Sequence, residues 1–285
     1  MFQFAQLLWV HEQTNKKYPI KIPIDNELLI RGRFNPSICD IDAYGLDLHK
    51  CFTLPIDLFD SKETILAKIE HNYQQSSTQV FDLVPEQVED NTNFSGYFQN
   101  IKFIQPIKDI LRTVLKFNPY VRAQTNIILD NINKQYHDPE ICAVHIRRGD
   151  GVMDNGRFQV LLDIEYYKER IKEVLESNPQ MVFVIVSDDI KWCKEQFDSL
   201  GGTFVYPNSN DNPNKITSQY IDMCLISKCD SIIMSNSSFS WWGAFLSNSE
   251  YIYVPDKWWG TDNKHICENL YMPEWNKCKT IGLGI

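Results

Sequence analysis

The sequence predicts an α/β protein with parallel sheets and flanking helices. In its second half, short apolar runs alternate with stretches of helical periodicity. The runs span residues 141–146, 181–186, 203–206, 231–234 and 251–254. Strands that alternate with helices form a parallel sheet with right-handed crossovers, as in Rossmann-like folds. Polar residues follow three of the runs, at 145–150, 187–189 and 235–238. Such sheets bind ligands at the carboxyl ends of their strands, so the three clusters are expected to converge there.

The first half is less regular. It opens at residues 1–10 with an apolar, helix-like run, and residues 64–73 and 104–117 read as amphipathic helices. Pro119 suits the first turn of a further helix. We place the domain boundary near residues 137–140, which gives a first domain at 1–138 and a second at 139–285.

The sequence of the second half contains signals for the start and end of its helices. Asp163 is predicted to cap a helix that stops at 178–179, and residues 187–189 to cap one that stops at the glycines 201–202. Two more helices are expected over 218–228 and 239–247. Trp241 and Trp242 in the last helix are interpreted as core residues, with a platform for a sugar ring as the alternative.

Composition excludes several classes of function. A formal charge of -9 on 285 residues argues against nucleic-acid binding, which needs a basic surface. No run of about 20 apolar residues is present, so no transmembrane segment is expected. The predicted location is cytoplasmic, either at the inner face of a membrane or free of it, with a membrane-anchored longer form as the alternative. The 8 cysteines include no C-x-x-C pair, which predicts buried free thiols and no zinc site.

The sharpest cluster is HIRRGD at residues 145–150. Arg147 and Arg148 each present a rigid, always charged fork that matches phosphate oxygens, and Gly149 allows close approach of the backbone. Transfer of a sugar from a nucleotide donor needs such charge, because negative charge grows on the departing diphosphate. The alternative for an Arg-Arg pair is a surface loop of salt bridges.

This cluster resembles the H-x-R-R-G-D signature of the α-1,2-fucosyltransferases, glycosyltransferase family 11, which are related to the α-1,6- and protein O-fucosyltransferases. The resemblance continues through four further segments. They are GYFQ at 96–99, DIEYY at 163–167, FVIVSDDIKWC at 183–193 and SNSSFSWWGA at 235–244. It therefore spans most of the chain.

The resemblance implies an inverting enzyme of two Rossmann-like domains (GT-B type) that needs no metal or other cofactor. The donor would be GDP-fucose, held mainly by residues 139–285. The acceptor would be a galactose-containing glycan, modified in α-1,2 linkage and held by residues 1–138.

The resemblance also implies roles for individual residues. Arg147 and Arg148 would contact the diphosphate, and His145 would lie against the nucleotide. Ser237 and Ser238 precede a helix, so their hydroxyls and the leading N–H groups would cradle a phosphate, although an ordinary N-cap explains them too.

Acidic residues carry the remaining roles. Asp222 would read guanine through its N1 and N2 donors, with a capping or solvent-facing carboxylate as the alternative. Asp188 would contact the ribose or base, although capping explains it nearly as well. Asp150 and Asp154 are the candidate catalytic bases, and a strongly dissociative path would depend less on any base.

Two other functions remain open at this stage. Residues 40–42, DID, would supply a D-x-D site in a metal-dependent glycosyltransferase. A non-catalytic protein that binds a nucleotide or sugar is the second alternative. Relatives open with a strand and a G-G-L-G-N-Q turn before M-F-Q-Y-A, whereas this sequence starts at MFQFA. We therefore expect the first strand of the first domain to be missing and activity to be poor.

Overall fold

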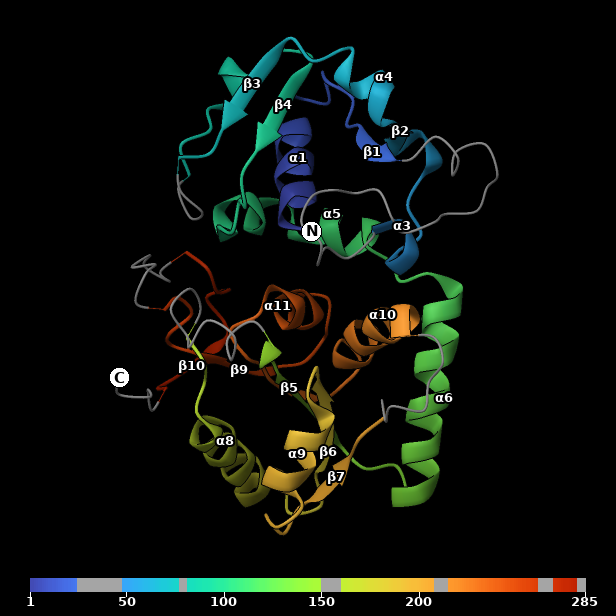
Figure 1. Cartoon of the computed structure of the whole chain (residues 1–285), viewed down its shortest axis with the longest axis vertical. Coiled ribbons are helices and arrows are strands. Elements are labelled where there is room, and N and C mark those ends of the chain that lie inside the picture. The colour runs from blue at the N-terminus through green and yellow to red at the C-terminus, as the bar shows by residue number, and fades with distance from the viewer. Residues whose placement is uncertain (25–47, 77–80, 150–159, 208–214, 261–268, 281–285) are drawn as a thin grey trace. The chain divides into compact units, whose positions relative to one another are not determined.

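The structure is a computed structural model that describes residues 1–24, 48–76, 81–149, 160–207, 215–260 and 269–280. It divides into two compact units, Met1–Asn118 with Glu268–Met272, and Pro119–Cys267 with Pro273–Ile285. This division assigns the helix that follows Asn118 to the second unit, whereas we placed the boundary after that helix. Figure 1 labels the elements of both units.

The second unit is built on a parallel sheet. Its strands are β5 (Ile141–Ile146), β6 (Val182–Ser187), β7 (Thr203–Val205), β8 (Ser231–Ile233), β9 (Tyr251–Pro255) and β10 (Asn276–Cys278). In the described residues the strand order is β10-β9-β8-β5-β6-β7, and every pairing is parallel. The chain leaves β5 in one direction and reverses before β8, which is the doubly wound arrangement of Rossmann-like folds. The predicted parallel α/β architecture is confirmed here.

Helices cover this sheet. They are α6 (Pro119–Tyr136), α8 (Ile164–Ser177), α9 (Ile190–Phe197), α10 (Lys215–Ile226) and α11 (Ser238–Phe245) (Figure 1). Alternate residues of β5 and β6 share one core cluster with α8 and α9, while α10 packs with α6 and α11. All of β5 is buried because helices cover both faces, and this explains why its sequence is apolar except for His145.

Local sequence signals set the ends of these helices. The Asp163 carboxylate accepts a hydrogen bond from the Glu165 N–H, and the Asp189 carboxylate accepts one from the Trp192 N–H, so both N-caps lie where capping was predicted. Trp241 is fully buried and Trp242 nearly so, which confirms them as core residues. Their helix packs closely on α10, since a Cβ at Gly243 would come within 2.7 Å of Ile226.

The first unit holds shorter elements. Its helices are α1 (Phe2–Gln13), α3 (Leu48–Cys51), α4 (Lys62–Leu66) and α5 (Lys108–Val114). Its strands form two parallel pairs, β1 (Ile22–Ile24) with β2 (Phe59–Ser61), and β3 (His71–Gln74) with β4 (Thr92–Ser95). One-turn helices lie at Ile56–Leu58, Pro85–Gln87, Ile101–Phe103 and Gln105–Ile107. Trp9 of α1 packs edge-on against Phe81 and Phe103, which anchors the helix in the core.

Two predicted helices of this unit are wrong in extent. Residues 64–73 do not form one helix, because α4 ends at Leu66 and the chain then forms strand β3. Residues 104–117 include Pro106, and only Lys108–Val114 is α-helical. Six cysteines are described and all are buried free thiols, as predicted. Within the described ranges, no helix has the length and apolar character needed to cross a membrane.

Candidate active site

Three loops meet at the carboxyl edge of the six-stranded sheet. Ile146 at the end of β5 pairs in register with Ser187 at the end of β6, so the residues that follow them lie at the same level. On the other side of β5, Val144 pairs with Ile233 of β8. The segments 147–149, 188–189 and 234–238 therefore share one rim, and the convergence predicted from the sequence is confirmed for these residues.

The loop after β5 is held by the loop after β6. Nη1 of Arg147 donates to Oδ2 of Asp188 at 2.8 Å. The backbone N–H groups of Arg148 and Gly149 donate to Oδ1 and Oδ2 of the same carboxylate, at 2.9 and 3.0 Å. Asp188 thus binds three consecutive residues, and the cap of α9 is its neighbour Asp189.

Arg148 lies in a different environment from Arg147. Its guanidinium carbon lies 3.8 Å from the centre of the Trp192 ring, and its Nε donates to Oδ2 of Asp189 at 3.3 Å. A cation over an indole face that is also paired to a carboxylate is fixed on two sides. The two adjacent arginines, alike in the sequence, therefore differ in how their forks are held.

His145 is buried behind this rim. Its Nδ1 lies 2.9 Å from Oγ of Ser235, and its ring centre lies 5.3 Å from that of Phe239. Burial lowers the pKa of His145 to about 3, against an opposing effect of the Asp188 charge. His145 is therefore neutral at pH 7, and the positive charge of the site comes from the arginines.

This burial gives an expected pH dependence of stability. Between pH 6.5 and about 3 the unfolded chain binds a proton at His145 that the folded chain does not, so the free energy of unfolding falls as the pH falls. The advantage of the wild type over a His145→Asn variant should shrink by about 1.4 kcal/mol per pH unit below 6.5. Urea unfolding from pH 7.5 to 5.0 measures it, because six of the seven tryptophans report on the second unit. A constant difference across this range would contradict the buried neutral histidine.

The loop before α11 is fixed by buried polar groups. Nδ2 of Asn236 donates to the carbonyl oxygens of Val160 and Trp258, at 2.7 and 2.9 Å. The Ser237 hydroxyl accepts a hydrogen bond from the Phe239 N–H, so Ser237 is the N-cap of α11. Ser238 is the first helical residue and is exposed at the rim. The capping role of Ser237 is thus confirmed, and its role toward phosphate stays a prediction.

The other predicted residues are placed less directly. Asp222 is half-buried in the middle of α10. The helix runs back from the carboxyl edge, so Asp222 lies about 10 Å along it from Lys215. Asp150 and Asp154 lie outside the described residues, as do residues 40–42. In the part of the chain that is described, no group of three or more His, Cys, Asp or Glu side chains could hold a metal ion.

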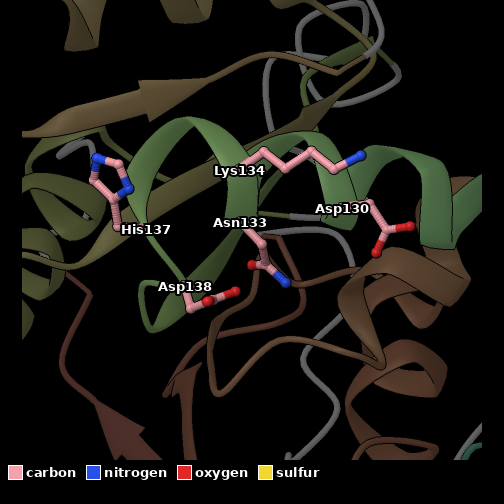
Figure 2. Close-up of a pocket in the computed structure, with 5 residues that line it drawn as sticks. All are labelled: Asp130, Asn133, Lys134, His137 and Asp138. Carbon is pink, nitrogen blue, oxygen red and sulfur yellow. The ribbon is translucent and has the colours of Figure 1, made fainter.

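A polar depression lies elsewhere, at the end of α6 and the turn that follows it (Figure 2). It has a volume of about 520 Å³ and is lined by Asp130, Asn133, Lys134, His137 and Asp138. This turn leads into the start of β5, so the depression lies at the amino edge of the sheet. Parallel sheets bind ligands at the opposite edge, so we place the site at the arginine loop.

Two residues that fix the rim were missed in the sequence. Asn236 and Trp192 lie within the motifs at 235–244 and 183–193, but the sequence assigns neither of them a role. An amide between serines directly after a strand is a signal for binding backbone carbonyls. The aromatic partner of Arg148 has no comparable local signal, because the two residues are 44 positions apart.

Comparisons with known proteins identify the family of the chain. The model of Glycosyl transferase family 11 matches residues 61–279. The O-antigen biosynthesis glycosyltransferase WbnK of Escherichia coli is 27% identical over 235 residues, 79% of this chain and 73% of WbnK. An alpha-1,2-colitosyltransferase of Escherichia coli is 34% identical over 165 residues, 55% of this chain and 52% of that protein.

More distant proteins match as well. Galactoside alpha-(1,2)-fucosyltransferase 1 of Lagothrix lagotricha is 24% identical over 191 residues, 64% of this chain and 50% of that protein. The chain thus spans about half the length of the colitosyltransferase and of this fucosyltransferase. Among solved structures, the apo form of POFUT1 matches with a TM-score of 0.40 and 10% identity, over 86% of this chain and 88% of that one. Because the family model covers most of the chain, including the arginine loop and the SNSS segment, this chain belongs to glycosyl transferase family 11.

Proposed function

We propose that this protein transfers L-fucose from GDP-fucose to a hydroxyl of a galactose-containing glycan, in α-1,2 linkage and with inversion. The observation that carries the proposal is the pair Arg147 and Arg148, held at the carboxyl edge of a parallel sheet. The start of α11 lies on the same rim. Together these features suit a nucleoside diphosphate and the negative charge that it gains on leaving.

In this mechanism the diphosphate is the leaving group. Arg147, whose side chain is one-third exposed, stabilises the charge that develops on it. Further hydrogen bonds to the phosphate oxygens would come from the start of α11, from the hydroxyls of Ser237 and Ser238 and the first N–H groups of the helix. His145 is neutral, so its expected contribution is to pack against the nucleotide and to hold Ser235 by a hydrogen bond.

The acceptor hydroxyl must lose a proton as the new bond forms. Asp150 and Asp154 are our candidates for the base, since they follow the arginines in sequence. We propose a reaction without a metal ion, because two fixed arginines supply the positive charge that a divalent cation supplies in other transferases.

Two alternatives have specific support. The similarity to an alpha-1,2-colitosyltransferase favours colitose as another sugar that this site could transfer. A protein that binds the nucleotide without catalysis is the second alternative. Both use the same diphosphate-binding rim, so they differ from the main proposal in the sugar or in turnover.

The deciding experiment incubates the purified chain with GDP-fucose and a panel of glycans with and without terminal β-galactose. EDTA is added to half of the reactions, and linkage analysis identifies the product. We expect an α-1,2-fucosylated galactoside with or without EDTA. Transfer from a colitosyl donor alone would show that the protein is a colitosyltransferase. Binding of GDP without product from either donor would show that it binds the nucleotide without catalysis.

We further predict selectivity for guanine. A carboxylate at Asp222 would accept two hydrogen bonds from the N1 and N2 donors of guanine and would face ring acceptors in adenine. GDP should inhibit at least about tenfold better than ADP or UDP, since hydrogen bonds to a charged group are worth about 1.5 to 3 kcal/mol each. Asp222→Ala should reduce the difference in inhibition between GDP and the other two nucleotides. Equal inhibition by the three nucleotides would refute guanine recognition, and an unaffected variant would reassign Asp222 alone.

A further inference from the structure

The Asp188 carboxylate holds the arginine loop through three hydrogen bonds. It accepts hydrogen bonds from the Arg147 side chain and from the backbone N–H groups of Arg148 and Gly149. All three distances lie between 2.8 and 3.0 Å. These bonds fix both the path of the loop and one edge of the Arg147 fork.

Gly149 is adapted to this contact. A Cβ atom at this position would lie 2.9 Å from Oδ2 of Asp188, closer than side-chain carbons approach an oxygen. The backbone of Gly149 is outside the left-handed region, so the dihedral angle would accept a larger residue, but its Cβ would have to displace the carboxylate. Loop and carboxylate therefore fit each other closely.

Asp188 holds the Arg147 side chain at one atom of its guanidinium. A guanidinium has five N–H donors in a rigid fork, and Asp188 uses one edge through Nη1. Because the Arg147 side chain is already ordered in the folded protein, less conformational entropy is lost when the substrate binds. The same carboxylate adds negative charge beside a site for a diphosphate, so its direct electrostatic effect on the donor is repulsive.

We propose that Asp188 is a positioning residue, which aims Arg147 and the 147–149 loop at the diphosphate and does not bind the donor itself. This inference rests on the proposed function. It makes a prediction of definite sign. If positioning dominates, removal of the Asp188 charge weakens GDP binding, whereas if Asp188 only competes with the diphosphate for Arg147, removal strengthens it.

The test uses the full chain with Asp188→Asn, and Asp198→Asn as the matched control. Asp198 lies on the same unit and accepts a hydrogen bond from the Tyr206 hydroxyl at 2.8 Å, away from the rim. GDP affinity is measured by calorimetry, and kcat and KM are measured with GDP-fucose. For Asp188→Asn we expect GDP affinity to fall about tenfold and kcat about a hundredfold. Asp198→Asn should match the wild type in both.

A double-mutant cycle shows whether Asp188 acts through Arg147. In an Arg147→Ala background, Asp188→Asn should lower activity further by much less than the hundredfold it costs in the wild type, because only the bonds to the backbone of Arg148 and Gly149 remain to be lost. Gly149→Ala is a second variant that keeps both charges and displaces Oδ2, and it should reproduce the loss of kcat. If substitutions of Asp188 fail to fold, Gly149→Ala still tests the proposal.

Three results would overturn the inference. They are wild-type turnover of Asp188→Asn, tighter GDP binding by this variant, or full additivity with Arg147→Ala. A wild-type chain that binds no GDP and transfers no sugar would instead refute the proposed function, and the inference would fall with it.

Discussion

Replacement of Arg147 by alanine is expected to lower turnover about a thousandfold or more, with little change in melting temperature. Arg147 supplies a charged fork at the carboxyl edge of the sheet, and its contact with the diphosphate strengthens as the bond to the sugar breaks. In the free protein the side chain is one-third exposed and its ion pair with Asp188 is partly exposed too, so its loss is expected to cost little stability. Single-turnover rates at saturating GDP-fucose measure the effect on the chemical step.

A matched control separates this effect from a general loss of charge. Arg122 is exposed on α6 of the same unit, and Arg122→Ala should retain wild-type turnover and stability. Near wild-type turnover of Arg147→Ala at saturating donor would show that Arg147 does not stabilise the leaving group. A change confined to KM would assign it to ground-state binding.

The structure ranks the two arginines. Arg148 stacks on Trp192 and pairs with Asp189, so part of its role is to hold the loop after β5 against α9. Arg148→Ala is therefore expected to lower turnover strongly, but less than Arg147→Ala does. It should lower the free energy of unfolding more than Arg147→Ala. No local pattern in the sequence indicates the contact of Arg148 with Trp192.

The sheet of the second unit could be predicted because its signals are local. Residues 141–146 are apolar except for His145 and residues 181–186 are all apolar, since strands covered on both faces have no polar side. Parallel strands put the residues after each run on one edge, which is how Arg147, Asp188 and Ser237 were grouped without a structure. Strand β10 was missed because Asn276–Cys278 has two exposed residues and no apolar run.

The first unit shows the opposite case. Ile65, Ile69 and Tyr73 recur at helical spacing, which favoured one helix over residues 64–73. The chain instead pairs His71–Gln74 with Thr92–Ser95, 21 residues further on. Tyr73 then packs against Phe94, a neighbour that no local pattern indicates. Tertiary pairing of this kind overrides a short helical period.

Within the site, the identity of the residues was predictable but the division of their roles was not. Asp188 and Asp189 are adjacent acids after a strand, and either could cap α9. Only the geometry shows that Asp189 caps the helix while Asp188 turns back to the 147–149 loop. Such a choice depends on the relative placement of β5 and β6, which is a property of the sheet.

Replacement of Asn236 by aspartate is expected to be the most destabilising conservative change in the site. Asn236 is 4% exposed, and its Nδ2 donates to the carbonyls of Val160 and Trp258. Aspartate has the same shape but presents an oxygen to both carbonyls, which leaves a buried charge without a donor. The expected cost is about 3 to 5 kcal/mol, against about 2 to 3 kcal/mol for Asn236→Ala. Melting temperature, followed by tryptophan fluorescence, should fall by roughly 6 to 20 °C for Asn236→Asp.

The matched control for this change is Asn178→Asp in the same unit. Its Nδ2 donates to Oε2 of Glu140 at 2.7 Å on the surface, so the new carboxylate also meets an acceptor but remains hydrated. Its cost should stay below about 1 kcal/mol. If the two variants melt within a few degrees of each other, the hydrogen bonds from Asn236 to the two carbonyls do not contribute the expected stability. If they differ as expected, turnover of Asn236→Asp should fall even below its melting temperature, because the same bonds hold Ser237 and Ser238 at the start of α11.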